Sequence, residues 1–451
     1  MTTEVAILNK SAVALAADSA VTIATRTGDS HRVTKIYAEA NKLFELVKGQ
    51  PVGVMIYNSA DIAGIPWETL IKVYRHRNPA AEFPTLEEYA DHFIAFVGAA
   101  LAPLMTEEDE RAELIDSFVP LADRLYDTFK PQIVAVQGRV QRREKFGELL
   151  DELETVLDGP STTVAKWAEG LNEGELWSRW GSDLTECIAS KTGEFTLTKP
   201  VRQRFARLVL RAFLRWPTAQ GTWSGLVISG FGADDMFPTV CHAEIGGFLE
   251  GRLVKVASTV DSVTNATPAL IRPYAQTSEA LMFLQGIDPE VSGAVSNFWA
   301  RWSRDLENDA IEIIKKESQV SAPHLEAIRQ RLSTHFKTSW QSFGNFMNEE
   351  FHLRRLEPIE GSAAFLSKRE IADLAENLVD LTSLRNRVSL DRQETVGGAT
   401  DVAVISKGDG FVWVKRKHYF ERDRNPAWAT RQALTDVLSR LQDMAEGEDA
   451  E

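Results

Sequence analysis

The 451-residue chain has little cysteine and little histidine, and this scarcity argues against several kinds of site. Its two cysteines, Cys187 and Cys241, form no CxxC motif, and its eight histidines include no HExxH motif. We therefore expect neither a disulfide framework nor a zinc site, and no metal or other cofactor. A GxxxxGK[ST] phosphate-binding loop is also missing, so the chain brings no such ATPase motif of its own. The sequence leaves open whether a separate ATPase acts with it.

Excess positive charge and long apolar runs are missing as well. The formal net charge is −15 and the sequence pI is near 5.2, which argues against nucleic acid or an anionic membrane as a partner. No uninterrupted apolar stretch is long enough to span a bilayer. Residues 11–17 are apolar, but Glu4 precedes them and Asp18 follows, unlike the pattern of a secretory signal. We expect a cytoplasmic protein.

The pattern of the first 77 residues is typical of two β-hairpins, a fifth strand and a helix. Helical periodicity follows from about residue 84 to 215 and returns over 289–357. The predicted strands are 4–9, 11–17, 35–39, 42–48, 52–57, 225–231, 237–245, 248–257, 401–406 and 411–416, and further helices are predicted at 61–77, 369–386 and 426–443.

Antiparallel strands in two groups, with helices between and after them, predict a layered α+β core with two large helical insertions. The chain is too long for one small core, which agrees with such insertions. The expected division assigns residues 1–83, 221–288 and 361–451 to the core and residues 84–220 and 289–360 to the insertions.

Thr2 is the strongest candidate for a catalytic residue, because of its position directly after Met1. Removal of Met1 is expected to leave Thr2 with a free α-amino group, whose pKa of about 7.7–8.0 suits a base at neutral pH. One residue then supplies both a hydroxyl nucleophile and its base. A lysine ammonium nearby would favour the neutral amine, a carboxylate can hold that lysine, and backbone N–H groups can stabilise an oxyanion.

The order of several segments matches these requirements. They are TTEVAIL, VALAADSAVT, VTKIYAEANKLF, VGVMIYNSAD, GLVISGF, EIGGFLEGRLVKV and GGATDVAVISKGDGFVWVKR, and they cover roughly half of the chain. In this order they resemble the N-terminal-nucleophile (Ntn) hydrolases of the proteasome β-subunit type, together with the related peptidase of the bacterial two-component ATP-dependent protease. The resemblance implies a four-layer αββα sandwich that hydrolyses amide bonds.

The resemblance also implies roles for individual residues. Thr2 would be the nucleophile, Asp18 the acid that orients the lysine, and Lys35 the lysine that tunes the amine. The implied oxyanion and substrate-binding residues are Ser19 and Thr22 along the channel and Tyr57, Asn58 and Ser59 after the fifth strand.

Three positions depart from the family pattern. Tyr57-Asn58 replaces a Gly-Gly pair, which a backbone contact tolerates but which narrows the cleft. The later serine of the family falls near Gln276-Thr277-Ser278 without a clear match. An Asp and a Ser of the family correspond to Gln393 and Val396.

The functional hypothesis is therefore a threonine-type hydrolase that cleaves a peptide or protein substrate through an acyl-enzyme on Thr2. Two alternatives stay open. One is a catalytically inactive proteasome-like scaffold or interaction protein, and the other is a small-molecule amidase or acylase on the same fold. Because the insertions would obstruct the contacts of a stacked ring, we expect a monomer or small homo-oligomer.

Overall fold

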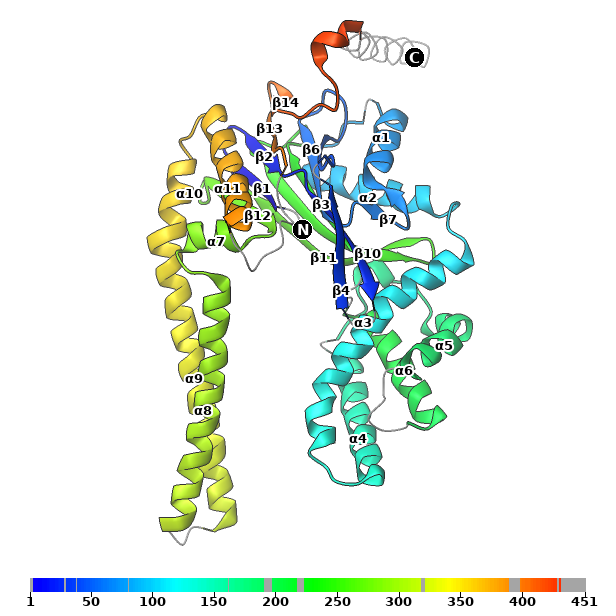
Figure 1. Ribbon diagram of the computed structural model, residues 1–451, viewed down its shortest axis with the longest axis vertical. Coiled ribbons are helices and arrows are strands. Elements are labelled where there is room, and N and C mark those ends of the chain that lie inside the picture. The colour runs from blue at the N-terminus through cyan, green and yellow to red at the C-terminus, as the bar shows by residue number, and fades with distance from the viewer. Residues whose placement is uncertain are drawn as a thin grey trace.

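The computed structural model describes residues 3–27, 30–37, 39–79, 81–160, 162–189, 197–216, 223–317, 321–388, 398–427 and 430. Over these ranges the chain combines long helices with two five-stranded sheets whose neighbouring strands are all antiparallel (Figure 1). The prediction of an α+β chain with antiparallel sheets is confirmed. None of the helices in the described ranges is both long enough and apolar enough to cross a membrane.

Each sheet joins segments that lie far apart in the sequence. The first sheet has the strand order β12 (Ala269–Ala275), β1 (Thr3–Asn9), β2 (Val13–Ala17), β13 (Asp401–Ser406) and β14 (Gly410–Lys415). The second sheet has the order β11 (Arg252–Ser262), β10 (Thr239–Leu249), β9 (Ser224–Gly230), β6 (Val52–Asn58) and β5 (Leu43–Glu45).

The two sheets pack face to face. Side chains alternate between the two faces of each sheet, and the inward-facing set of one sheet contacts that of the other. On β1, Ala6 and Leu8 belong to the apolar cluster that also contains Met55 of β6 and Val227 of β9. Gly53 marks the closest approach of the sheets, since a Cβ atom there would lie 2.8 Å from Ile405 Cδ1 and 3.0 Å from Leu15 Cδ1.

Helices cover the outer face of each sheet. Val5 and Ile7 of β1 share a second cluster with α7 (Ser278–Gln285), α10 (Glu357–Ala363) and α11 (Lys368–Val388). A third cluster joins the second sheet to α1 (Trp67–Arg77) and α2 (Leu86–Leu101). Fully buried Trp67 fixes α1 to β9, because its Nε1 donates a hydrogen bond of 2.8 Å to Ser224 Oγ.

Four further helices form a lobe with its own core beside the second sheet (Figure 1). They are α3 (Glu107–Val134), α4 (Arg139–Leu157), α5 (Glu173–Ala189) and α6 (Lys199–Phe213), and the short 3-10 helix η1 (Lys166–Ala168) adds Trp167. The rings of Phe146 and Phe205 meet edge to face at the centre of this lobe, 5.4 Å apart.

Helices α8 (Pro289–Glu317) and α9 (Ala322–Phe351) form a long hairpin that projects away from the sheets (Figure 1). Trp299 stacks on Trp340 across the hairpin, with ring centroids 5.3 Å apart. Most of the other large apolar side chains stay in solvent, and Phe298 is 62% exposed. A π-helix, η2 (His352–Leu356), leads from α9 back to α10.

The predicted hairpin of 35–39 with 42–48 is wrong. Instead β4 (Ser30–Tyr37) pairs with β3 (Val21–Thr27), while β5 pairs with β6. Residues 21–27 are not among the predicted strands. Their β-branched alternation favours a strand, and the Gly-Asp dipeptide that follows is typical of a hairpin turn.

Two other boundaries also differ from prediction. The helix predicted at 61–77 begins only at Trp67, because Ala63 and Gly64 have φ values of 51° and 73° within the small turn of β7 (Asp61–Ile62) and β8 (Ile65–Pro66). Strand β12 was missed. It contains Pro273, which an edge strand tolerates. The helix predicted near 426–443 lies mostly outside the described residues.

The close approach of the sheets gives a stability prediction. Gly53→Ala places a methyl group between Ile405 and Leu15, so we expect a loss of about 1–3 kcal/mol in the free energy of unfolding, measured by chemical denaturation. Gly361→Ala is the control, because it adds a Cβ atom in open space on α10 and should be neutral or slightly stabilising. Equal stability of the two variants would contradict the packing of the sheets at Gly53.

Candidate active site

The ends of β1 and β2 hold a buried carboxylate beside the start of the chain. The backbone N–H of Thr3 donates to Asp18 Oδ1 at 3.1 Å, and the N–H of Asp18 donates to the carbonyl oxygen of Thr3 at 3.1 Å. Asp18 is 1% exposed. Thr2 lies outside the described residues, but it is covalently joined to Thr3. Asp18 therefore contacts the residue that follows the predicted nucleophile in the sequence.

A lysine completes this arrangement, and it is Lys42. Its Nζ lies 2.7 Å from Asp18 Oδ1 and also donates to the carbonyl oxygen of Ala20. Lys42 is 5% exposed, and its carbonyl oxygen accepts the N–H of Ile56 in β6 at 2.9 Å, which anchors the lysine to the second sheet. Burial lowers the pKa of Lys42 from its ordinary value, and the charge of Asp18 opposes that change.

Lys35, the lysine named in the sequence analysis, lies on β4 opposite Ile23 of β3. Its side chain is outside the part of the structure that is described, so its predicted role stays a prediction. The sequence could have indicated a role for Lys42. This lysine lies between the polar Asn41 and the buried strand residues Leu43 and Phe44. A lysine at the buried end of an apolar strand needs a charged partner.

Ser19 and Thr22 had been predicted along the substrate channel. Ser19 is fully buried, its Oγ donates to the carbonyl oxygen of Ala399, and its own carbonyl oxygen accepts the N–H of Ala40 at 3.0 Å. Through its hydroxyl and its carbonyl oxygen, Ser19 therefore ties the end of β2 to two neighbouring segments. Thr22 lies on β3, and its side chain is outside the described part.

The end of β6 holds the three residues predicted to bind an oxyanion or substrate. The N–H of Ser59 donates to the carbonyl oxygen of Trp223 at 3.1 Å, so this N–H points toward β9. Because N–H directions alternate along an antiparallel strand, the N–H of Asn58 lies on the opposite edge, as does that of Ile56, which reaches Lys42. Asn58 is thus the residue of the three whose N–H leaves β6 on the side of β5, the side on which Ile56 reaches the backbone of Lys42.

A cavity of about 190 Å³ joins these groups. It is lined by Glu39, Ala40, Asn41, Lys42, Ile56, Tyr57, Asn58, Ser59, Ala60, Pro66 and Glu68. Asn58 adopts a φ of 66°, and its side-chain Nδ2 donates to the carbonyl oxygen of Trp223 at 2.9 Å. This contact holds the left-handed conformation, which asparagine tolerates better than most residues. The positive φ turns the chain at the rim of the cavity.

Glu4 is a buried carboxyl that the sequence analysis did not single out. It alternates with Ala6 on β1, so its side chain enters the space between the sheets, and it is 0% exposed. Neither carboxyl oxygen has a hydrogen-bond partner in the described part of the chain. Burial raises the pKa of Glu4 well above its ordinary value, the charge of Lys42 opposes this, and the charge of Asp18 adds to it.

A second buried ion pair lies next to Asp18. Asp401 pairs in register with Ala17, and Lys417 donates to Asp401 Oδ2 and, through its backbone N–H, to Asp401 Oδ1 at 2.8 Å. The positive charge of Lys417 contributes to lowering the pKa of Lys42. The sequence motif GGATDVAVIS placed Asp401 on a strand but gave no sign of this pairing.

The later family positions are only partly visible. Gln276 and Thr277 precede α7, and Gln276 Oε1 accepts a hydrogen bond of 3.1 Å from Asn386. Gln393 and Val396 lie outside the described residues. Within the described ranges, no three His, Cys, Asp or Glu side chains come together in a way that can hold a metal ion.

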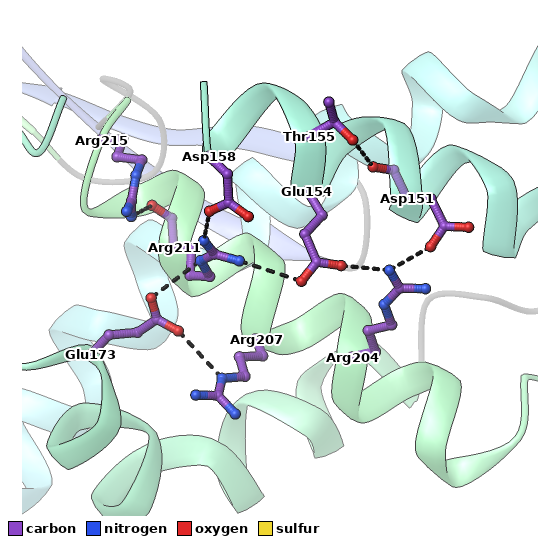
Figure 2. Close-up of polar contacts among 9 residues, drawn as sticks. All are labelled: Asp151, Glu154, Thr155, Asp158, Glu173, Arg204, Arg207, Arg211 and Arg215. Atoms are coloured by element: carbon purple, nitrogen blue, oxygen red, sulfur yellow. Dashed lines mark hydrogen bonds and ion pairs between the residues drawn. The ribbon is translucent and has the colours of Figure 1, made fainter. Parts of the chain in front are cut away.

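A cavity of about 620 Å³ lies in the helical lobe and not near Asp18. Its lining includes Arg204, Arg207 and Arg211 of α6, and Figure 2 shows that carboxylates of α4 and α5 pair with all three. Arg204, for example, lies 2.5 Å from Glu154, and Arg207 lies 3.3 Å from Glu173. Because the charges are matched, we interpret this network as a link between helices and not as a reactive site.

The buried carboxyl of Glu4 predicts a pH dependence of stability. Its pKa is raised in the folded chain, so the folded state keeps this proton at pH values where the unfolded state has lost it. The contribution of Glu4 is therefore fully present below its unfolded pKa and is lost as pH rises through the folded pKa. Glu4→Gln removes the titration but keeps the shape of the side chain.

As pH rises above the unfolded pKa of a glutamate, we expect Glu4→Gln to lose less stability than the parent, measured by urea denaturation at each pH. Glu326→Gln, which removes an exposed carboxylate on α9, is the control and should follow the parent. If Glu4→Gln and the parent show the same pH dependence, the carboxyl of Glu4 is not buried as described.

Comparison with known proteins adds no family to this description. No protein-family model matches the chain, and no curated protein matches its sequence. The case for a function therefore rests on the geometry around Asp18 and Lys42.

Proposed function

We propose that the chain is an Ntn hydrolase of the proteasome β-subunit type, which cleaves amide bonds through an acyl-enzyme on Thr2. Its fold would then be the four-layer αββα sandwich of that family. In support, two facing antiparallel sheets carry helices on their outer faces, and β1 begins at Thr3, directly after the proposed nucleophile.

The observation that carries the proposal is the Asp18–Lys42 ion pair beside Thr3. The two side chains are 1% and 6% exposed, and burying two charges costs several kcal/mol per ion before their attraction offsets it. An apolar pair of similar size is often at least as stable. The position of the pair at the start of β1 therefore favours a chemical role over a purely structural one.

The chemistry can be stated atom by atom. Thr2 Oγ forms a bond to the carbonyl carbon of the substrate, and the neutral α-amino group of Thr2 takes the hydroxyl proton. The Lys42 ammonium favours that neutral amine by like-charge repulsion, and Asp18 holds the lysine in place. The backbone N–H of Asn58 donates to the oxyanion.

Collapse of the tetrahedral intermediate breaks the C–N bond. The leaving amine receives the proton held by the α-amino group, and the acyl group stays on Thr2 as an ester. Water then adds to the ester carbonyl carbon while the α-amino group takes its proton. Loss of the Thr2 alkoxide, which regains that proton, releases the carboxylic acid and restores the free enzyme.

This proposal moves the lysine role from Lys35 to Lys42. Lys42 is favoured because its Nζ lies 2.7 Å from Asp18 Oδ1 and because Lys42 and Asn58 line the same cavity. Peptide and small-amide substrates use the same steps, so a peptidase and an amidase or acylase stay alternatives. An inactive scaffold is favoured only by the departures at Gln393 and Val396.

A small homo-oligomer or monomer stays our prediction for assembly. The helical lobe and the α8–α9 hairpin add bulk beside the sandwich (Figure 1). Both would have to be accommodated in any ring of stacked sandwiches. The mature protein is proposed to act in the cytoplasm without a cofactor, on a peptide, protein or small amide.

The proposed nucleophile is tested by Thr2→Ala and Thr2→Ser with a library of peptide and small-amide substrates. We expect Thr2→Ala to lose at least about 1000-fold in turnover, because the substitution keeps the α-amino base but removes the hydroxyl that forms the acyl-enzyme. Thr2→Ser keeps a hydroxyl and an α-amine and should retain measurable turnover. Full activity of Thr2→Ala would refute the acyl-enzyme on Thr2.

The two lysines are compared by Lys42→Met and Lys35→Met in the same assay. Lys42→Met should lose turnover about as fully as Thr2→Ala, whereas Lys35→Met should keep most of it. Removing one partner of a buried pair costs about 3–5 kcal/mol, so folding of Lys42→Met is checked by thermal melting. The double variant Asp18→Asn with Lys42→Met removes both charges and should fold yet stay inactive. Loss of activity only in Lys35→Met would return the role to Lys35.

A further inference from the structure

A second cavity of about 420 Å³ adjoins the Tyr57-Asn58 segment, and Lys42 is not among its lining residues. We name it the aromatic cavity, and its lining residues are Tyr57, Asn58, Trp223, His242, Glu244, Pro273, Tyr274, Ala275, Gln276 and Thr277. Tyr57 and Asn58 line both this cavity and the smaller one that contains Lys42. Ala275 pairs with Thr3, so the aromatic cavity also reaches the strand position next to Thr2.

Its wall is formed by rings from both sheets. Tyr57 meets Trp223 edge to face with centroids 5.6 Å apart, and it stacks with Tyr274 of the first sheet at 6.2 Å. The Tyr57 hydroxyl is hydrogen-bonded to His242 Nε2 at 2.7 Å, which fixes these two rings relative to each other. The wall is therefore preorganised before any ligand enters.

The rings carry no positive charge of their own. Burial lowers the pKa of His242, so the imidazole stays neutral at neutral pH. Burial also raises the pKa of Tyr57 and Tyr274, which keeps both hydroxyls protonated. Neutral aromatic faces with a negative quadrupole attract a cation placed over them.

Glu244 adds a carboxylate to this wall. It lies two residues after His242 on β10 and therefore on the same face of the second sheet. Its side chain is half-buried, and within the described ranges it makes no hydrogen bond and no ion pair. This half-buried carboxylate stands beside three aromatic rings, with no cation next to it in the described part of the chain. It has lost hydration without gaining a partner, so the wall lacks a positive group.

We propose that the aromatic cavity binds a cationic group of the substrate, a guanidinium or an alkylammonium, between its rings and the carboxylate of Glu244. The inference rests on the proposed hydrolase function and adds the substrate class to it: amides that carry a positive charge near the bond that is cleaved. An uncharged aromatic group could also stack on the rings of the cavity, but it would leave the carboxylate of Glu244 without a partner.

The position of the cavity connects recognition with cleavage. A cation held beside Tyr57 lies in a cavity that Lys42 does not line, and the amide next to it can then reach the N–H of Asn58. The positive charge of the substrate is thereby bound away from the ammonium of Lys42. This separation avoids like-charge repulsion at the reacting atoms.

The proposal is tested by binding and not by turnover, so that it can fail independently of the proposed function. The full chain carrying Thr2→Ala is titrated calorimetrically with N-acetyl-arginine methylamide and with the citrulline analogue, which has nearly the same shape but no charge. We expect the arginine ligand to bind at least about tenfold more tightly. A lysine amide and its analogue with an acetylated side chain, which has no charge, give the same comparison for an ammonium group.

Glu244→Gln in the same background should remove most of that difference, while the exposed control Glu326→Gln should preserve it. Trp223→Leu provides a second variant, which removes a ring without touching β10, and should weaken arginine binding more than citrulline binding. Equal affinity for the charged and uncharged ligands, or binding that is unchanged by Glu244→Gln and Trp223→Leu, would overturn the assignment of the cavity. Clear arginine binding without turnover by the parent chain would instead leave the cavity in place and count against the hydrolase.

Discussion

The buried contact between Lys42 and Asp18 is the interaction on which the account of the site depends. It links the end of β2 in the first sheet to the segment that enters β5 in the second, so the two sheets are joined by charge as well as by apolar packing. The same aspartate accepts the N–H of Thr3, which aligns the start of β1 with the lysine. Displacing Asp18 or Lys42 would leave the other charge buried without its partner.

The rest of the fold holds this contact in a polar end of an otherwise apolar sandwich. Toward the middle of the strands the sheets meet through Leu8, Leu15 and Met55. At one end, apolar residues give way to Glu4, to the Asp18–Lys42 pair and to the aromatic cavity that includes Tyr57. Polar groups gathered at one end of a packed core are costly to stability, and such costs are common where a protein acts chemically.

Much of the core was predictable from the sequence, because its signals are local. Alternation and turn residues located β1, β2, β6 and the final hairpin. The chain position of Asp18 followed from the same pattern. The pairing of Lys42 with Asp18 was not predictable, because a contact between residues 24 positions apart depends on how β3 and β4 leave the sandwich as a separate hairpin. The predicted pairing of 35–39 with 42–48 is incompatible with that hairpin, because it assigns residues 35–37 of β4 to a different partner.

The aromatic cavity shows the same limit more strongly. Its rings come from β6, β10, β12 and Trp223, which precedes β9. Strand β12 was not predicted, since Pro273 is typical of a break in a strand. Nor does any local pattern reveal that Glu4 has no hydrogen-bond partner among the described residues, because that depends on which side chains the opposite sheet places beside it. Residues whose role comes from packing between sheets need the structure.

The most direct measurement of the central claim is the intact mass of the full-length protein before and after treatment with an electrophile directed at N-terminal threonine. The account predicts a mass without Met1, one adduct per chain, and peptide mapping that places the adduct on Thr2. It further predicts that Lys42→Met, folded as judged by its melting curve, forms the adduct far more slowly. A protein that retains Met1, or an adduct that forms equally well without Lys42, would contradict the account.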